Sequence, residues 1–435
     1  MAFENWKVKK IDNTEIEILD GDRGKNYPNK KELFQTGHTL FLSNKNLHGD
    51  KLNVDLGEYI SKEKDEALRQ GKLVREDILM STRGSVGNVG YFHKGINANN
   101  IRINSGMIIF RNKDKELMND YLYHLLKSPY CKNQYIELTS GSVQNQLPIR
   151  DLRNLKLLIP SIKEQNEIVN ILGALENKID NNNSIISNLE KLAQTLFKRW
   201  FVDFEFPNEN EEPYKSSGGE MVGNEFGSIP EGWAVGTASE LFYFSPTTPL
   251  KKGEITDYVE MKDLNSSAVI SSWSKREFAG SGSKFMNGDT LLARITPCLE
   301  NGKIGFVDFM EEDATGWGST EFITIRSKPG YSKTLSYFFA SNPEFKLFAI
   351  KNMNGSSGRQ RVRYQTLEDY TTVIPPKDII EKFTSITDVM INKMSILRYQ
   401  IKNVENLRDT LLPKLLSGEI ELPDETEVNE YVPIS

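Results

Sequence analysis

The chain has 435 residues and 38% hydrophobic content, which supports globular cores and, from length alone, two or three domains. Only two cysteines occur, which excludes a disulfide framework and is typical of a reducing compartment. The formal net charge is −6, but residues 203–220 and the tail from residue 419 carry more than this acidic excess. The rest of the chain is therefore mildly basic, so charge does not exclude a nucleic-acid partner.

The N-terminus does not resemble a signal peptide, because residues 1–13 lack a charged region followed by an apolar core. No stretch approaches the roughly 18 apolar residues that a membrane span needs. We therefore expect a cytoplasmic protein without a membrane partner.

Residues 1–160 are expected to form a first mixed α/β domain. Within it, residues 76–92 predict a β-hairpin, because two apolar stretches flank a polar, glycine-containing loop. A further strand is expected at 106–111 and a short helix at 121–128. A polar loop at 141–146 lies near the end of the domain.

One long helix is predicted for residues 161–202. Its apolar positions begin at Ile168 and recur at spacings of four and three up to Trp200, with a polar interruption at Asn182. This spacing is a heptad pattern, and a helix of about 40 residues would extend roughly 60 Å. Such a helix packs either on its own domain or against a second helix.

Residues 203–231 lack apolar periodicity and are rich in acidic residues, Gly and Ser, which predicts an exposed, protease-sensitive linker. A second mixed α/β domain is expected at 232–376 and a second long helix at 377–418. An acidic tail at 419–435 follows.

The second half of the chain repeats the first. A duplicated unit predicts a pseudo-twofold molecule, and two matched heptad helices favour pairing with each other over packing on separate domains. The matched segments are 152–200 with 367–415, 41–47 with 258–264, and 76–92 with 288–307.

Three motifs carry a family resemblance that covers nearly the whole chain. The first is the strand-Pro-x-x-x-Glu-Gln pattern at 159–165, the second is ARITPCLENGKIG at 293–305, and the third is LLPKLLSGEI at 411–420. With these motifs the chain resembles the specificity subunit of type I restriction-modification systems. It departs from the pattern at Ile379 and Ile380, where Glu-Gln is expected, so the two helix starts need not contact partners identically.

The resemblance implies an α+β protein with two target recognition domains in pseudo-twofold arrangement, separated by two long antiparallel helices that form a coiled coil. Each domain would read one half of a bipartite, asymmetric site on double-stranded DNA, and the helices would set the unread gap. Such a subunit is not catalytic and binds no cofactor itself. It holds two methyltransferase subunits and recruits restriction subunits, and S-adenosylmethionine, ATP and Mg are expected on those partners.

Polar side chains in equivalent loops of the two domains supply the donors and acceptors that distinguish base edges. The loops differ in their residues, as two different half-sites would require. An exposed edge strand made soluble by charge is the alternative for the arginine-rich segment. The candidate DNA-binding residues are Lys45, Arg83, Ser85, Ser142, Gln144 and Gln146 in the first domain and Lys262, Arg294, Thr296, Lys303, Ser356, Arg359, Gln360, Arg361 and Arg363 in the second.

A self-contained methyltransferase and a coiled-coil scaffold are the competing hypotheses. Residues 278–282 spell the F-x-G-x-G pattern of adenosylmethionine-binding loops, but no buried strand precedes them. Residues 342–345 lack the second proline of an amino-methyltransferase motif, and the chain has no GxxxxGK[ST] phosphate loop. The four histidines have no metal-ligand spacing, so neither catalytic residues nor a metal site is expected.

The outer face of the first long helix carries Leu192, Phe197 and Trp200. These residues either form a docking site for methyltransferase subunits or belong to an intramolecular core.

Overall fold

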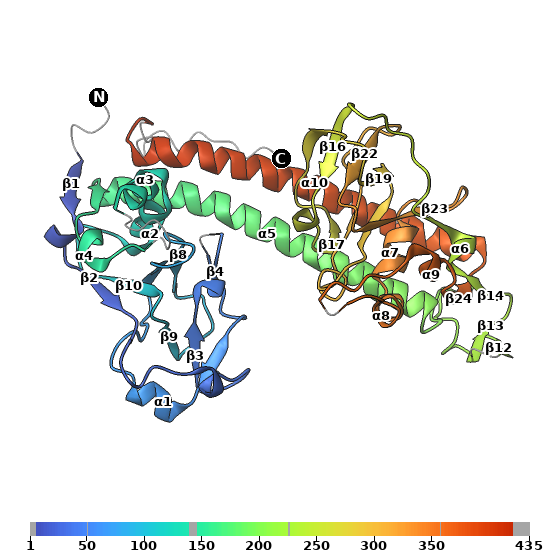
Figure 1. Cartoon of the computed structure of the whole chain (residues 1–435), viewed down its shortest axis with the longest axis horizontal. Coiled ribbons are helices and arrows are strands. Elements are labelled where there is room, and N and C mark those ends of the chain that lie inside the picture. Colours follow the sequence, from blue (N-terminus) through green and yellow to red (C-terminus); the bar gives the residue numbers. More distant parts are fainter. Residues whose placement is uncertain (1–5, 50, 139–145, 225–226, 357, 421–435) are drawn as a thin grey trace. The chain divides into compact units, whose positions relative to one another are not determined.

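The computed structural model describes residues 6–49, 51–138, 146–224, 227–356 and 358–420. The chain divides into two compact units, Met1–Asn177 with Glu405–Ser435, and Lys178–Val404. The division cuts through both long helices, α5 (Ile162–Phe201) and α10 (Lys377–Leu416), each of 40 residues. Each unit is therefore one α/β head together with part of each helix, as the colours of Figure 1 show.

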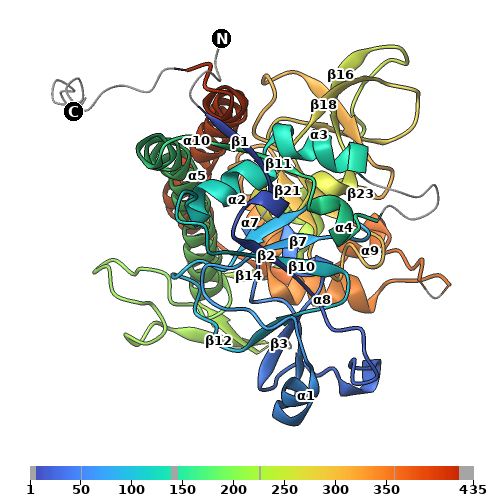
Figure 2. The same cartoon turned by 90° about the vertical axis from the view of Figure 1, so that its left-hand side faces the viewer.

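The first unit is built on a four-stranded antiparallel sheet of order β2-β10-β7-β8 and a three-stranded sheet of order β6-β3-β9. Helix α2 lies beside α5 (Figures 1 and 2), and Lys127 of α2 pairs with Glu176 of α5. The strands are β1 (Lys7–Lys10), β2 (Ile16–Asp20), β3 (Thr39–Leu42), β4 (Leu47–His48), β5 (Lys51–Leu52), β6 (Glu58–Ile60), β7 (Ile78–Ser81), β8 (Val89–Tyr91), β9 (Ile101–Ile103), β10 (Met107–Asn112) and β11 (Lys156–Ile159). The helices are α1 (Lys62–Ala67), α2 (Asn119–Lys127), α3 (Pro129–Leu138) and α4 (Ile149–Leu152).

The second unit has a five-stranded sheet of order β15-β23-β20-β21-β17 and a four-stranded sheet of order β18-β16-β22-β19. The strands are β12 (Met221–Asn224), β13 (Gly227–Pro230), β14 (Ala234–Thr237), β15 (Phe242–Phe244), β16 (Ile255–Val259), β17 (Ser266–Val269), β18 (Ser274–Glu277), β19 (Ser283–Met286), β20 (Thr290–Ala293), β21 (Ile304–Phe306), β22 (Thr315–Gly318), β23 (Phe322–Ser327) and β24 (Thr371–Ile374). The helices are α6 (Ala238–Leu241), α7 (Leu335–Ser341), α8 (Pro343–Lys351) and α9 (Tyr364–Glu368).

The two units share one topology. Strands β2-β10-β7-β8 correspond to β15-β23-β20-β21, and the parallel pair β3–β9 corresponds to the parallel pair β16–β22. Even short 3₁₀ turns recur, with a capping box at η3 (Asn44–Asn46) and at η4 (Met261–Asp263). The predicted hairpins are present as β7–β8 and β20–β21, so the repeat in sequence is a repeat in structure.

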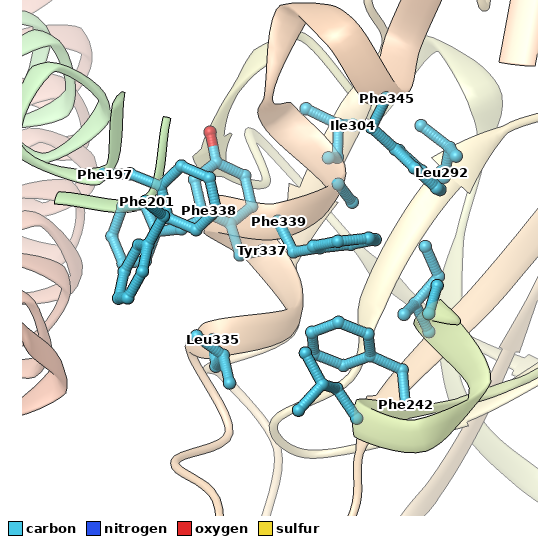
Figure 3. Packing of buried hydrophobic residues seen from close by; sticks show 14 of the residues in the cluster. Phe197, Phe201, Phe242, Leu292, Ile304, Leu335, Tyr337, Phe338, Phe339 and Phe345 are labelled. Atoms are coloured by element: carbon cyan, nitrogen blue, oxygen red, sulfur yellow. The ribbon is translucent and has the colours of Figure 1, made fainter. Parts of the chain in front are cut away.

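In the second unit aromatic residues at the end of α5 pack on Phe383 of α10. The ring of Phe383 lies 5.8 Å from Phe197, 5.8 Å from Trp200 and 4.9 Å from Phe201, measured between centroids. Figure 3 shows Phe197 and Phe201 beside Phe338 of α7, so this core joins both helices to the head. Phe197 and Trp200 are buried and therefore belong to an intramolecular core, whereas Leu192 is exposed.

The pairing of the two helices is antiparallel, because contacting residue numbers run in opposite directions. Phe201 contacts Phe383 near one end of the second unit, and Asn182 donates to Gln400 at 3.3 Å farther along. In the first unit, residues from the start of α5 and the end of α10 share one hydrophobic cluster. That cluster includes Ile168, Leu172, Leu412 and Leu415.

The start of α5 is anchored by polar contacts. Glu164 accepts a hydrogen bond from the Trp6 indole at 3.0 Å. Gln165 is fully buried, accepts from the Met118 amide at 2.8 Å and donates to the Glu116 carbonyl at 2.7 Å. Because a buried amide must be hydrogen-bonded, this glutamine fixes how the helix leaves the first head.

The start of α10 uses apolar packing instead. Ile379 and Ile380 are buried where α5 has its Glu-Gln pair. The second opening tryptophan, Trp233, stacks on Phe206, with centroids 5.1 Å apart and planes inclined by 26°. The departure from the family pattern is therefore an exchange of a polar anchor for an apolar one.

Residues 203–231 differ from the exposed linker that their composition predicts. Phe206 is buried and stacks on Tyr214 as well as on Trp233. The Tyr214 hydroxyl donates to the Glu220 carbonyl at 3.0 Å, and β12 and β13 form a hairpin. Three aromatic residues, spaced too widely for a helical or strand period, hold this acidic segment on the second unit.

Candidate nucleic-acid interface

In the first unit, three segments meet at the loop of the β7–β8 hairpin. The Leu147 amide donates to the Thr82 carbonyl at 3.1 Å, and Arg83 forms an antiparallel bridge with Gln146. The Asn44 side chain donates to the Arg83 carbonyl, which ties the η3 turn to the same loop. Lys45 on that turn is exposed, and its neighbour Asn44 contacts the loop that carries Arg83 and Ser85 and that bridges to Gln146. Ser142 and Gln144 lie outside the described residues.

The loop that carries Arg83 is closely constrained. Ser81 is buried and its hydroxyl donates to the Ser85 carbonyl across the turn. Gly87 has φ +86°, and a Cβ there would lie 2.9 Å from the Tyr135 ring. Because other residues rarely adopt this φ, glycine is needed at the turn. The exposed Ser85 is therefore presented on a fixed backbone.

The second unit repeats this arrangement with other side chains. The Val362 amide donates to the Arg294 carbonyl at 3.0 Å, and Arg361 bridges to Ile295. The Thr296 amide donates to the Gln360 carbonyl at 3.0 Å, and the Gln360 amide donates to the Thr296 hydroxyl at 3.1 Å. These bonds connect residues 360–362 firmly to the β20–β21 loop.

The sequence repeat suggests that Arg83 and Ser85 correspond to Arg294 and Thr296, but the backbone bonds shift this alignment by one position. Arg83 bridges to Gln146 as Ile295 bridges to Arg361, so Arg83 is equivalent to Ile295 and not to Arg294. Thr82 is the equivalent of Arg294, since each carbonyl accepts from the amide two residues before α4 or α9. The two loops differ in length, so the sequence alone does not show which of their residues are equivalent.

The remaining candidates of the second unit fall into two groups. Ser356, Arg359 and Arg363 are exposed. Lys262 is exposed but pairs with Glu260 at 2.7 Å, and Lys303 donates to the Met261 carbonyl at 2.6 Å. Lys303 thus ties the hairpin loop to η4, so its ammonium is engaged in holding the two loops together.

A carboxylate that sequence reasoning missed lies among the arginines. Arg361 donates to Glu321 through Nε at 2.9 Å and through Nη2 at 2.6 Å. The Arg294 Nε lies 3.8 Å from the Glu321 Oε2. The hydrogen bonds from Arg361 hold the pKa of Glu321 below its ordinary value. Glu321 directly precedes β23, where a charged residue is unremarkable, so no sequence signal marked it.

The surface beside these loops is hollowed. A cavity of about 720 Å³ is lined by charged, aromatic and amide side chains. Its lining residues are Arg294, Phe348, Arg363, Tyr364, Gln365, Thr366 and Asp369.

The features that favoured an enzyme have other roles in the fold. Residues 278–282 connect the exposed strand β18 to β19, and not a buried strand to a helix. The Asn342 side chain accepts from the Glu344 amide at 3.1 Å and caps α8. Within the described ranges, no group of His, Cys, Asp and Glu could hold a metal ion. Nor does any helix in that part of the chain have the length and hydropathy to cross a membrane.

Comparison with known proteins places the chain in a family. The family described as "Type I restriction modification DNA specificity domain" matches residues 4–191 and 230–406. The MjaIX specificity subunit of Methanocaldococcus jannaschii is 25% identical, covering 97% of this chain and 95% of the relative. The HindI specificity subunit of Haemophilus influenzae is 23% identical, covering 91% and 95%.

A solved structure supports the fold. The S subunit of a type I restriction-modification system from M. genitalium superposes with a TM-score of 0.54 at 15% identity, covering 97% of this chain and 96% of that one. The two matched domains coincide with the two heads that carry the equivalent loops. The chain therefore belongs to the specificity subunits of type I restriction enzymes, which recognise DNA and are not themselves catalytic.

Proposed function

We propose that this chain recognises a bipartite, asymmetric site on double-stranded DNA, with one half read by each unit. The observation that carries this proposal is that one backbone arrangement occurs twice with different side chains. Gln146 in the first unit stands where the second has Arg361, and Gly106 stands where the second has Glu321. Since amide and guanidinium groups pair with different base edges, the two loops suit two different sequences.

The long helices are proposed to set the unread gap between the half-sites. Each is continuous over 40 residues, and the two pair in antiparallel fashion within each unit. A helix has a fixed rise per residue, so its length converts directly into a distance. Buried Asn182, with its bond to Gln400, favours one register of the pair over others.

We also propose that two methyltransferase subunits dock on the chain and that restriction subunits join the complex. In the second unit, most apolar side chains between the two helices are buried, but others remain exposed on both helices. Exposed apolar residues at recurring helix positions are typical of a protein interface. These residues are Ile185 and Leu192 on α5 and Ile386, Val389 and Ile396 on α10.

The chemistry is then supplied by the partners. S-adenosylmethionine is expected on the methyltransferase subunits, and ATP and Mg on the restriction subunits. The complex would act in the cytoplasm, where the DNA lies.

The proposal is tested by mapping methylated adenines in the genome of a host that expresses the chain with its methyltransferase. The expected motif has two constant blocks separated by an unread gap of constant length. A matched strain carrying Arg361→Ala should show relaxed sequence in one block only. A continuous motif, or relaxation of both blocks, would contradict division of the reading between the units.

A further inference from the structure

The carboxylate of Glu321 lies at the centre of the second unit's candidate interface. Its side chain is 23% exposed, and the guanidinium of Arg361 is 38% exposed beside it. Arg361 contributes Nε and Nη2 to the pair, with Nε within hydrogen-bonding distance of both carboxylate oxygens. The carboxylate therefore engages one side of the planar guanidinium.

This geometry leaves the end of the guanidinium available. Arginine has five N–H donors in a fixed plane, and the pair with Glu321 uses Nε–H and one Nη2–H. The second Nη2–H and the Nη1 donors point along the same plane. The contact from Nη1 to the Arg359 carbonyl is long, at 3.5 Å, and competes weakly. Two parallel donors at the end of an arginine match the O6 and N7 acceptors of guanine.

The backbone around this pair is also fixed. Arg361 forms two backbone hydrogen bonds with Asn354, both 2.9 Å, and a bridge with Ile295. Glu321 is held at the start of β23, and its carbonyl accepts from the Arg294 amide at 2.9 Å. Both ends of the ion pair are therefore anchored to the sheet, which limits the motion of the guanidinium plane.

Charge distinguishes a base contact from a phosphate contact. The carboxylate of Glu321, 2.6 Å from Arg361, neutralises it and also faces Arg294 at 3.8 Å. A neutral pair attracts phosphate weakly, whereas reading a guanine needs donors of fixed direction more than it needs net charge. The exposed Arg359 and Arg363 are better suited to phosphates because no carboxylate pairs with them among the described residues.

We propose that Glu321 is a positioning residue that holds Arg361 as a fork for one guanine in the half-site of the second unit. This inference rests on the proposed function, because it assumes that the unit reads DNA. The first unit has glycine and glutamine at the two positions and cannot form the pair.

The test uses the complete complex of this chain with its methyltransferase, and duplexes in which each base pair of the second unit's half-site is replaced in turn. Dissociation constants are measured for the wild type, R361A, R361K, E321Q and the double variant R361A/E321Q. E312Q is the matched control, since it removes a carboxylate from an exposed ion pair with Lys333 in the same unit. Thermal unfolding of each variant checks that the fold is retained.

We expect the wild type to prefer guanine at one position by about 5- to 150-fold, the usual value of a bidentate contact. R361A, R361K and E321Q should all lose most of this preference at that same position, and the double variant should be no worse than R361A. R361K is decisive because it keeps the charge but lacks the fork. E321Q should bind unrelated DNA as tightly as the wild type or more tightly, since a negative charge is removed, and E312Q should keep the preference.

Three results would overturn the inference. The first is that E321Q keeps the full preference while R361A loses it, and the second is that R361A weakens binding to all sequences equally and R361K restores it. The third is that E321Q lowers both the melting temperature and the affinity for every duplex, which is the result expected if Glu321 only stabilises the fold. Failure of the proposed function is a separate result, in which the wild-type complex shows no preference among the duplexes.

Discussion

Glu190 offers the sharpest test of how α5 is fixed to the second head. Its carboxylate is 6% exposed and accepts hydrogen bonds from the Ser267 hydroxyl at 3.0 Å and the Ala268 amide at 3.0 Å. The Tyr337 hydroxyl and the Gln194 side chain donate to it as well. Burial, and next the nearby Glu190, raise the pKa of Tyr337 well above its ordinary value, so the phenol remains a donor.

The substitution Glu190→Ala removes the acceptor and leaves Ser267, Ala268 and Tyr337 with unpaired donors. An unsatisfied buried donor costs about 1–3 kcal/mol, and the losses are not fully additive, so we expect roughly 3–5 kcal/mol of destabilisation. The repeat supplies a matched control. Glu405 occupies the same position of the second helix, is only partly buried, and has no hydrogen-bond partner among the described residues.

The measurement is urea unfolding followed by tryptophan fluorescence, with hydrogen exchange to assign the loss to the second unit. Glu405→Ala should change the free energy of unfolding by less than about 1 kcal/mol, as surface substitutions usually do. The reasoning fails if both substitutions cost the same, or if Glu190→Ala costs less than about 1 kcal/mol.

Four further predictions concern the loop, acid stability, docking and spacing. Gly87→Val should distort the first unit's loop, because φ is +86° and Tyr135 lies 2.9 Å from a Cβ, so methylation mapping should show relaxation of one half-site only. Lys7 and Lys9 lower the pKa of Glu116 to about 2, so the pair stabilises the fold above the ordinary value of 4.5 and this contribution is lost as the pH falls toward 2. Glu116→Gln should therefore lower the melting temperature at pH 7 but leave it unchanged at pH 2. Val389→Asp should reduce co-purification with the methyltransferase, whereas Ile255→Asp, on a strand of the same unit and 72% exposed, should not; equal loss would contradict docking on the helices. Adding a heptad to both helices where the units divide should lengthen each by about 10 Å and widen the unread gap by about three base pairs; an unchanged gap in the methylated motif would contradict the spacer role.

The long helices and the repeat could be predicted from the sequence because both depend on local periodicity. The heptad spacing from Ile168 to Trp200 predicts a helix and the side of it that is buried. Helix α5 covers this segment, and most of these heptad positions are buried. The hairpins followed from apolar stretches around glycine-containing loops, and pairing of β7 with β8 and of β20 with β21 confirms them. Two copies of each pattern made a shared topology the simplest expectation.

Only the tertiary structure decided which side chains meet. Phe206 and Tyr214 lie in a segment whose composition predicts an open linker, yet Phe206 stacks on Tyr214 and on Trp233 of the following domain. Aromatic contacts between residues far apart in the chain leave no period in the sequence. The register that makes Arg83 equivalent to Ile295 depends on backbone bonds across a gapped loop. Composition and periodicity thus determined the elements and their duplication, since those depend on neighbours along the chain. The pair of Glu321 with Arg361 depends on two strands meeting in space, and only the fold could supply it.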